Sequence, residues 1–579
     1  MNKKISISLL YLLILAGTAH AALRVTDLRT EQLKNPLGID IRHPRLGWRI
    51  ESDEQNVMQT AYHILVASSP ELLAQGKGDC WDSGKVKTDA SQWITYQGET
   101  LKRNTPYYWK VKVYTHTNET DWSEPASWSM GLLNEADWQG QWIGLDRPAP
   151  GDSETQWSRL AARYLRKEFA LTKEVKRATV HIAGMGLYEL FINGQRIGEQ
   201  VLAPAPTDYR KTILYNTYDV TPQLQKENAI GVILGNGRFY TMRQNYKPYK
   251  IPTFGYPKLR LNLIVEYTDG SRQTIASDIS WKLTTEGPIR SNNEYDGEEY
   301  DGRKELGDWN RTGYDDTNWI PAGRVSIPSG TLRAQMMPGM KVTESLKPVS
   351  IRKQGDKQIL DIGQNMAGWL RIRIKGQAGD SIRLRFAERL QPDGEIFTKN
   401  LRDAHCTDIY VVSGREPQDA TWAPRFVYHG FRYVEISGYP NAKTEDFTAE
   451  VVDDEMAHTG TFTCSDETLN QVLRNAFWGI RSNYKGMPVD CPQRNERQPW
   501  LGDHAMGSWG ESLFFNNHAL YNKCTRDIRE AQREDGCIPD VAPAYWNYYS
   551  DNVTWPATLP LVCDMLFTNY GDRRAIEEN

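Results

Sequence analysis

The sequence is poor in cysteine, has no excess of basic residues and contains one long apolar run. Its seven cysteines, at positions 80, 406, 464, 491, 524, 537 and 563, are odd in number and include no C-x-x-C pair. This argues against a disulfide framework and against a zinc site. The formal net charge is −4 and the pI is about 6.3, so the chain lacks the basic field that nucleic-acid-binding proteins use. Disulfide scaffolds, zinc proteins and nucleic-acid binders are therefore excluded.

The apolar run lies at the N-terminus. Lys3 and Lys4 precede apolar residues 5–19, and Ala19-His20-Ala21 places small residues at the two positions that a signal peptidase reads. The run is too short for a membrane-spanning helix with its own stop signal, and no cysteine follows it as a lipid attachment site. We predict a signal peptide over residues 1–21, no membrane anchor, and a periplasmic or secreted location.

The remaining chain, about 560 residues, is too long for one hydrophobic core and predicts three or four domains. Up to about residue 460, short runs of alternating apolar and polar residues are separated by Gly, Asn, Asp and Pro, which predicts antiparallel β-sandwiches. Examples are residues 62–67, 107–114 and 259–265. Beyond that point the apolar spacing becomes helical.

The first helix is predicted behind Ser465-Asp466-Glu467, which supplies an N-cap. Its apolar residues at i, i+3 and i+4 spacing are Leu469, Val472, Leu473, Ala476 and Ile480. Further helices are predicted over about 513–531 and from 559 to about 569. The chain is thus expected to consist of several β domains followed by an α-helical domain.

The densest cluster of charge is Asp490-Cys491-Pro492-Gln493-Arg494-Asn495-Glu496-Arg497-Gln498-Pro499-Trp500-Leu501-Gly502-Asp503. Three carboxylates, two arginines and a tryptophan are difficult to explain as core, because buried charge is costly unless each group is paired. Carboxylates and guanidinium groups bind hydroxyls through paired hydrogen bonds, and an indole face packs on the C–H side of a sugar ring. The 19 Trp and 29 Tyr of the chain also suit carbohydrate binding. The cluster predicts a site for a polyhydroxylated substrate.

The carboxylates of this cluster also suit glycoside hydrolysis. That reaction needs one carboxylic acid to protonate the departing oxygen and one carboxylate to activate water or attack carbon. Asp490, Glu496 and Asp503 are six and seven residues apart, so a loop entering a helix can direct them to one pocket. Arg494 and Arg497 are expected to lower the pKa of the carboxylate each pairs with and to leave another free to hold its proton.

The cluster resembles the signature D-C-P-Q-R-D-E-R-x-G-W-x-G-D of bacterial α-L-rhamnosidases of glycoside hydrolase family 78. Asn495 and Pro499 stand where the family usually has Asp and Gly. The resemblance implies hydrolysis of terminal α-L-rhamnose with inversion of configuration, a rhamnose-containing oligo- or polysaccharide as partner, and no catalytic cofactor. The oligomeric state is left open.

The resemblance also assigns roles to residues. Glu496 would be the general acid. The residues that would bind the sugar are Asp490, Arg494, Asn495, Trp500, Asp503, Trp546, Asp551 and Trp555. Trp555 would pack against the C6 methyl group of the deoxy sugar, whereas Trp546 fits a core position equally well.

The domains implied are a fibronectin type III-like sandwich over 22–133, a jelly-roll, carbohydrate-binding-like domain over 134–335, a further β-sandwich over 336–455, and the beginning of an (α/α)6 barrel over 456–579. In the jelly-roll, Asn193-Gly194 predicts a two-residue hairpin turn. Asp208 and Asn236 are candidates for a sugar or Ca²⁺ contact, although a calcium site needs six or more oxygens. The acidic stretch 295–303 is expected to be a solvated loop, with an interdomain latch or cleft lip as the alternative.

An inverting enzyme needs a second carboxylate roughly 6.5–9.5 Å from the acid. In the family this base lies far downstream, so we expect it beyond the C-terminus of this chain, in a catalytic domain that is apparently truncated. The 579-residue chain alone is expected to have little or no hydrolase activity. Two alternatives stay open: a non-catalytic carbohydrate-binding fragment, and an inverting glycosidase that acts on another deoxy or manno-configured sugar.

Overall fold

The computed structural model describes residues 23–116, 118–153, 159–240, 254–550 and 552–579. The chain forms two compact units. The first comprises Met1–Pro36, Arg42–Leu101 and Pro106–Trp128, and the second comprises Leu37–Ile41, Lys102–Thr105 and Ser129–Asn579. The predicted signal peptide lies outside the described residues.

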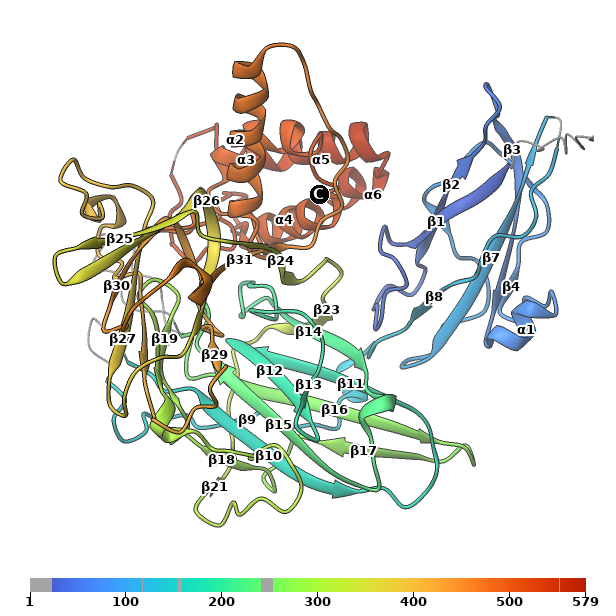
Figure 1. Cartoon of the computed structure of the whole chain (residues 1–579). Coiled ribbons are helices and arrows are strands. Elements are labelled where there is room, and N and C mark those ends of the chain that lie inside the picture. Colours follow the sequence, from blue (N-terminus) through green and yellow to red (C-terminus); the bar gives the residue numbers. More distant parts are fainter. Residues whose placement is uncertain (1–22, 117, 154–158, 241–253, 551) are drawn as a thin grey trace, which may run out of the picture. The chain divides into compact units, whose positions relative to one another are not determined.

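The first unit contains two β-sheets and one short helix (Figure 1). Along β7, Tyr107, Trp109, Val111 and Val113 are buried at alternate positions, as the period of two predicts. One sheet has the order β1 (Arg24–Thr30), β2 (Arg45–Glu51), β6 (Ile94–Thr95). The other has the order β4 (Trp81–Asp82), β3 (Gln59–Ala67), β7 (Pro106–Thr115), β8 (Ala126–Ser129), with β5 (Val86–Lys87) paired to β3 and α1 (Pro70–Ala74) following β3.

The second unit begins with two further sheets that share an apolar core. One has the order β13 (Gln195–Arg196), β12 (Leu187–Ile192), β15 (Glu227–Gly235), β10 (Arg163–Ala170), β18 (Lys282–Thr284), β21 (Ile320–Pro321). The other has the order β22 (Gly323–Arg324), β9 (Ile143–Gly144), β16 (Lys258–Tyr267), β11 (Val175–Met185), β14 (Thr212–Asp219), β23 (Thr331–Ala334), with β17 (Arg272–Ala276) paired to β16. The predicted Asn193-Gly194 turn is confirmed: it joins β12 to β13, and both residues have positive φ, 51° and 82°.

A ten-stranded sheet carries the remaining β structure. Its order is β19 (Ile289–Asn293), β20 (Gly297–Asp301), β28 (Thr407–Val411), β27 (Ser381–Ala387), β30 (His429–Ser437), β26 (Lys357–Arg373), β31 (Phe447–Asp454), β24 (Met340–Leu346), with β25 (Ser350–Gln354) and β29 (Thr421–Trp422) paired to β26. Most pairs are antiparallel, as predicted, but β20–β28 here and β14–β23 in the preceding sheet are parallel. The hairpin β19–β20, which the predicted boundaries assign to the jelly-roll, is thus bonded into the following sheet.

The acidic stretch 295–303 is not a solvated loop. It contains β20, and Tyr295 and Glu298 are each 1% exposed. Glu298 Oε2 accepts hydrogen bonds from the backbone N–H groups of Arg425 and Phe426, at 3.0 and 3.2 Å. Burial raises the pKa of Glu298 to about 8, so a neutral carboxyl group can occupy this position at neutral pH.

The helical part follows β31. Asp466 caps the first predicted helix. Its side chain accepts hydrogen bonds from the N–H groups of Thr468 and Leu469. The helix predicted from Leu513 begins five residues later, and the chain between Trp500 and Ser512 forms a helix that the spacing did not predict. Gly571, with φ 71°, ends the helix predicted from 559. The helices are α2 (Glu467–Asn483), α3 (Leu501–Glu511), α4 (His518–Ala531), α5 (Thr558–Tyr570) and α6 (Arg573–Glu578).

Short 3₁₀ turns lie among the β-strands. They are η1 (Glu135–Asp137), η2 (Thr221–Gln223), η3 (Gly302–Lys304), η4 (Lys399–Leu401) and η5 (Thr444–Asp446). No helix among the described residues is long and apolar enough to cross a membrane. All seven cysteines lie in the described part of the chain and are free thiols.

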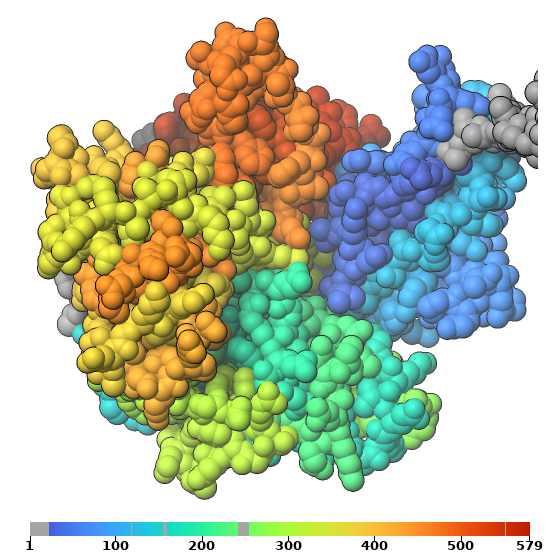
Figure 2. Space-filling model, viewed as in Figure 1, coloured from blue at the N-terminus to red at the C-terminus, as the bar shows by residue number. Residues whose placement is uncertain are grey.

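Helix α2 packs against β26 and β31, and Ile480 of its apolar stripe packs against a buried cluster, but the first part of the stripe is exposed. Leu469 and Val472 are 51% and 56% exposed, and Phe462, just before the helix, is 59% exposed. The segment projects from the surface in the space-filling view (Figure 2, orange). The spacing therefore predicted the helix correctly, while Leu469 and Val472 of its stripe stay exposed.

Candidate functional site

The charged cluster predicted as a site forms the loop between α2 and α3, called here the motif loop (residues 490–500). Arg497 anchors it: the residue is 0% exposed and has φ 51°. Its guanidinium donates to the backbone carbonyls of Glu294, of Tyr428 at 2.9 Å and of Gln493 at 3.3 Å. The expectation that Arg497 pairs with a carboxylate of the cluster is therefore wrong. It holds main-chain oxygens and fixes the loop against the β part.

Two buried side chains of the β part hold the backbone carbonyls of Glu496 and Arg497. Tyr295 donates its hydroxyl to the carbonyl of Glu496 at 3.3 Å, and Arg238 donates to the carbonyl of Arg497. Within the loop, Gln498 Nε2 also donates to the Glu496 carbonyl, at 2.7 Å. Three hydrogen bonds thus fix the main chain at Glu496 and Arg497.

Glu496 is 8% exposed, and its carboxylate accepts three hydrogen bonds. Arg494 Nε donates to Oε2 at 2.7 Å, Arg402 Nη1 donates to the same oxygen at 2.9 Å, and Trp500 Nε1 donates to Oε1 at 3.0 Å. Sequence reasoning missed Arg402, which follows η4 and lies 94 residues before Glu496. Nothing local in the sequence marks such a contact.

Asp490 lies on the other side of Arg494. Its side chain is 5% exposed, accepts from Arg494 Nη2 at 3.1 Å, and accepts from the Gln498 N–H at 2.7 Å. Burial raises the pKa of Asp490 to about 6, and the nearby Glu496 charge adds to that effect. One guanidinium group therefore bridges two of the three carboxylates that the sequence predicted to converge.

Asn495 and Asp503 flank this pair. Asn495 is 4% exposed, and its amide Nδ2 lies 3.5 Å from Asp403 Oδ2. Asp503 is exposed in the first turn of α3, where a carboxylate is favoured by the helix dipole. Partial desolvation raises its pKa, and the charge of Glu496 acts in the same direction.

The predicted aromatic residues separate into two positions. Trp500 is half-buried and packs edge to face against Trp546, with ring centroids 5.8 Å apart. Trp546 is 1% exposed, so the structure places it behind Trp500 and not at the surface where a sugar ring could stack. Trp555 is half-buried and packs on Gly502, where a Cβ would lie 2.5 Å from its ring. Asp551 lies outside the described residues.

A cavity of about 410 Å³ opens beside the motif loop. Asp490 and Arg494 line it from the loop, Trp478 and Asn475 from α2, and Glu388 from the segment after β27. The structure thus brings Asp490, Arg494, Glu496 and Trp500 into one hydrogen-bonded group at the edge of a cavity. This group does not include Asp503 or Trp555. Asp503 lies in the first turn of α3, and the ring of Trp555 packs against Gly502 of the same helix.

Asp490, Cys491 and Glu496 also place three potential metal-ligand atoms within 4.8 Å of one another. Both carboxylates, however, accept hydrogen bonds from guanidinium groups, which supply the positive charge here. Burial raises the pKa of the Cys491 thiol, which disfavours the thiolate that binds metals. We assign no metal to this group.

The two jelly-roll candidates have different surroundings. Both carboxylate oxygens of Asp208 accept from the Arg210 guanidinium, at 2.9 and 2.8 Å. Asn236 is 2% exposed and its Oδ1 has no hydrogen-bond partner in the described structure, but no cluster of acidic, cysteine or histidine ligands that includes Asp208 occurs among the described residues. A sugar or calcium contact at these residues stays a prediction, and a calcium ion would need six or more oxygens.

Four family models match successive parts of the chain. They are a Rha78A-like N-terminal immunoglobulin domain (residues 25–134), an α-L-rhamnosidase N-terminal domain (173–344), a bacterial α-L-rhamnosidase concanavalin-like domain (351–453) and a bacterial α-L-rhamnosidase six-hairpin glycosidase domain (457–579). An α-L-rhamnosidase of Streptomyces avermitilis is 30% identical over 96% of this chain and 70% of its own length. The chain belongs to the bacterial α-L-rhamnosidase family.

Other α-L-rhamnosidases agree with this assignment. One from Formosa agariphila is 35% identical over 95% of the chain, and the chain spans 60% of that relative's length. The solved α-L-rhamnosidase of Dictyoglumus thermophilum has a TM-score of 0.89 at 38% identity, over 96% of this chain and 63% of that one. The Streptomyces avermitilis structure complexed with L-rhamnose has a TM-score of 0.90 at 28% identity, over 96% and 70%. Immunoglobulin-like and other β-rich domains followed by a six-hairpin glycosidase domain are thus the architecture of this α-L-rhamnosidase family member.

Proposed function

We propose that this chain carries the acid and sugar-binding side of an inverting α-L-rhamnosidase site, which releases terminal α-L-rhamnose from glycosides or polysaccharides. The observation that carries the proposal is the Arg494 guanidinium, which bridges Asp490 and Glu496 on an anchored loop beside a cavity. Family membership and the relatives named α-L-rhamnosidase support the reaction. The general base is not assigned to a residue of this chain, and the helical part is proposed to belong to an (α/α)6 barrel.

Glu496 is proposed as the general acid. An acid must carry its proton on an oxygen that can face the departing oxygen. Oε2 already accepts from two guanidinium groups, whereas Oε1 accepts only from the Trp500 indole. A protonated carboxyl oxygen can still accept a hydrogen bond, so Oε1 is the oxygen that can hold the proton without breaking the Arg494 and Arg402 contacts.

The sugar would be bound by neighbouring polar groups. Asp490, Arg494, Asn495 and Asp503 are proposed to bind its hydroxyls, because carboxylate, guanidinium and amide groups satisfy the donors and acceptors of a polyol. Trp500 is proposed to form part of the wall, with Trp546 supporting it from behind. Trp555 is proposed to contact the C6 methyl group, and the predicted contact of Asp551 stays a prediction. A periplasmic or secreted location is proposed from the predicted signal peptide alone.

The test separates recognition from chemistry. Calorimetry would measure L-rhamnose binding to the chain and to Glu496→Gln, while release of p-nitrophenol from p-nitrophenyl α-L-rhamnoside would measure hydrolysis by the protein that contains this chain. Glu496→Gln should keep L-rhamnose affinity within about threefold and lower hydrolysis by about 10²–10⁴-fold, because the amide cannot donate the proton. The exposed Glu534 supplies the control variant, Glu534→Gln, which should change neither quantity.

Three outcomes would redirect the proposal. Hydrolysis at the wild-type rate in Glu496→Gln would remove Glu496 from the reaction. Binding of L-rhamnose without hydrolysis would favour a carbohydrate-binding role. In that role Glu496, held in place by its three donors, would only accept hydrogen bonds from the sugar. Tighter binding of another deoxy or manno-configured sugar would change the substrate and keep the site.

A further inference from the structure

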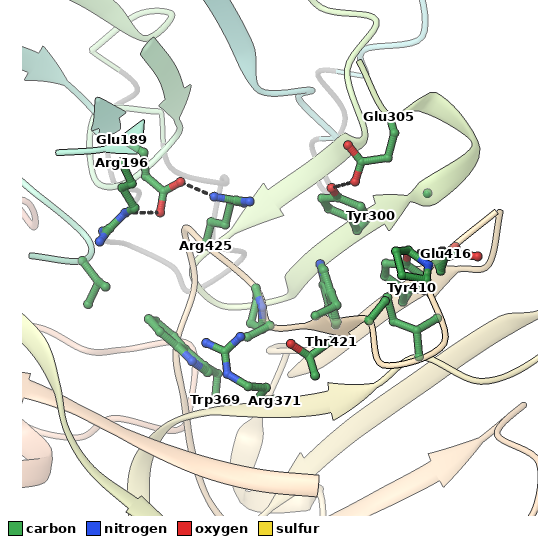
Figure 3. Close-up of a pocket in the computed structure, with 18 of the residues that line it drawn as sticks. Glu189, Arg196, Tyr300, Glu305, Trp369, Arg371, Tyr410, Glu416, Thr421 and Arg425 are labelled. Atoms are coloured by element: carbon green, nitrogen blue, oxygen red, sulfur yellow. Dashed lines mark hydrogen bonds and ion pairs between the residues drawn. The ribbon is translucent and has the colours of Figure 1, made fainter. Parts of the chain in front are cut away.

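A large cleft of the β part is separate from the motif loop. Its volume is about 1100 Å³, and no residue of 490–500 lines it. Figure 3 shows Glu189 of this cleft bonded to both Arg196 and Arg425, so these charged groups already have partners. Another segment of the β part does reach the motif loop. It comprises residues 402–406, which join η4 to β28, and is called here the 402–406 loop.

The 402–406 loop contacts the proposed acid and its neighbour along the chain. Arg402 Nη1 donates to Glu496 Oε2 at 2.9 Å, and Asp403 Oδ2 lies 3.5 Å from Asn495 Nδ2. Arg494, of the motif loop itself, donates to the same Glu496 oxygen at 2.7 Å. Two guanidinium groups, one from the concanavalin-like domain and one from the six-hairpin domain, therefore meet on one carboxylate oxygen.

Cys406 and Tyr295 hold the two loops on a common support. The Cys406 thiol donates to the carbonyl of Gln493 at 3.1 Å, and burial raises the pKa of this thiol to about 12, so it keeps the proton that it donates. The Cys406 N–H donates to the carbonyl of Tyr295 at 3.2 Å. Because the Tyr295 hydroxyl in turn donates to the carbonyl of Glu496, one residue is bonded to both loops and fixes their spacing.

The backbone of Arg402 is strained. Its φ of 57° and ψ of −120° lie in a region that glycine favours, because a Cβ there crowds the neighbouring peptide. Buried residues fix the chain on either side of it: Leu401 and Cys406 are each 1% exposed. Strain of this kind persists only where the surroundings impose it, and it is concentrated at functional sites. Here the strained residue is the one whose side chain reaches Glu496.

We propose that Arg402 is a positioning residue for the general acid. Arg494 is shared between Glu496 and Asp490, and a sugar hydroxyl bound by Arg494 would draw it away from Oε2. Arg402 keeps a charged donor on that oxygen, so that Oε1, which carries the proton, stays directed at the departing oxygen. The concanavalin-like domain is then part of the catalytic site and not only its scaffold. The inference rests on the proposed function, because it needs Glu496 to be the acid.

Three substitutions of Arg402 separate this role from a contribution to folding. Arg402→Met keeps the strained backbone and removes the charge, Arg402→Gly removes the charge and relieves the strain, and Arg402→Lys keeps the charge. They would be assayed on an α-L-rhamnosyl disaccharide, in the protein that contains this chain. Arg402→Met and Arg402→Gly should both lower kcat by about 10–100-fold, the effect of one hydrogen bond to a charged group, and change KM by less than about threefold. Arg402→Lys should recover part of this loss, and Arg402→Gly should unfold at a higher temperature than Arg402→Met.

Two further comparisons make the result specific to acid catalysis. p-Nitrophenolate departs with little help from a proton donor, whereas a sugar hydroxyl must be protonated as it leaves. The loss of kcat in Arg402→Met should therefore be several times smaller with p-nitrophenyl α-L-rhamnoside than with the disaccharide. Asn441→Gly is the matched control and should leave kcat unchanged, because Asn441 is exposed and also has positive φ, 47°, but lies in another turn, between β30 and η5.

Wild-type kcat in Arg402→Met would overturn the inference and, with hydrolysis lost in Glu496→Gln, would leave the proposed function intact. Equal losses of kcat with the two substrates would also overturn it, as would a kcat that follows the unfolding temperature across Arg402→Met and Arg402→Gly, because Arg402 would then act through folding. Wild-type hydrolysis in Glu496→Gln would overturn the proposed function and this inference with it.

Discussion

At the scale of single residues, the two carboxylates of the motif loop differ in their surroundings although both accept from Arg494. It donates to both, but Glu496 has two further donors in Arg402 and Trp500, whereas Asp490 has the Gln498 backbone N–H. Asp490 is also the more enclosed side chain, at 5% exposure against 11% for Glu496. The same guanidinium therefore binds two carboxylates in unequal surroundings, and burial raises the pKa of Asp490.

The raised pKa of Asp490 predicts a pH-dependent stability. Because its folded-state pKa is about 6 against an ordinary value of 3.8, the folded state binds this proton more tightly than the unfolded chain. The stabilisation is complete below about pH 3.8 and is lost as pH rises through about 6. The loss is about 3 kcal/mol, since one pKa unit corresponds to about 1.4 kcal/mol.

Asp490→Asn removes this titration. The difference in free energy of unfolding between wild type and variant should move by about 2.4 kcal/mol, most of that loss, in the variant's favour between pH 4 and pH 7. Urea unfolding of both proteins at each pH would measure it. The constant offset from the lost Arg494 contact does not matter, because only the change with pH is read. A difference independent of pH would show that Asp490 does not titrate in this range.

At the scale of elements, strand β30 supports the motif loop through Gly430. A Cβ at this position would lie 2.9 Å from Pro492 Cγ and Gln493 Cβ, and 3.2 Å from Gln493 Cα. Gly430→Ala should therefore displace the loop, lower the free energy of unfolding by about 1–3 kcal/mol and weaken L-rhamnose binding. Thermal unfolding and calorimetry would measure the two effects.

Gly510→Ala is the matched control for that substitution. Gly510 lies in α3, and an added Cβ would meet nothing within 4 Å. Alanine there should raise stability by up to about 1 kcal/mol through helix propensity. Should Gly430→Ala behave like Gly510→Ala, the close contact between β30 and the loop would not exist in solution.

The elements that could be predicted from the sequence are those specified by residues close to one another along the chain. Helix α2 follows from its 3.6-residue spacing and from Asp466 as N-cap, and the β12–β13 turn follows from Asn193-Gly194. Helix α3 was missed because Gly502, Gly507 and Gly510 weaken its helical pattern and because its first residues belong to a motif interpreted as a loop.

The parts that sequence could not predict depend on residues distant along the chain. Arg402 reaches Glu496 across 94 positions, and Arg497 binds carbonyls of Glu294 and Tyr428 instead of a nearby acid. The acidic stretch was expected in solvent because four carboxylates in nine residues are costly to bury. Backbone donors from Arg425 and Phe426 make the burial of Glu298 tolerable. The residue types of the site were predictable, and their pairing was not.

At the scale of the whole molecule, the first part of the α2 stripe and the preceding Phe462 are exposed apolar surface of the helical part. Phe462, Leu469 and Val472 are each more than half exposed, and neighbouring apolar side chains at this exposure favour association. The opposite side of the helix is well held: Arg481 pairs with Asp453 at 2.8 Å. The helix therefore does not depend on its outer face for its position.

Polar substitution of that face should lower self-association without lowering stability. The double variant Leu469→Gln, Val472→Gln removes exposed apolar area from a helix in which glutamine is a good helix former, so the midpoint of thermal unfolding should change little. Light scattering at rising concentration should show less association than in the wild type. Leu520→Gln is the control, because Leu520 is 0% exposed in α4 and its loss should cost several kcal/mol. If the double variant were destabilised as much as this control, the stripe would be packed in solution, and its exposure would not describe the molecule.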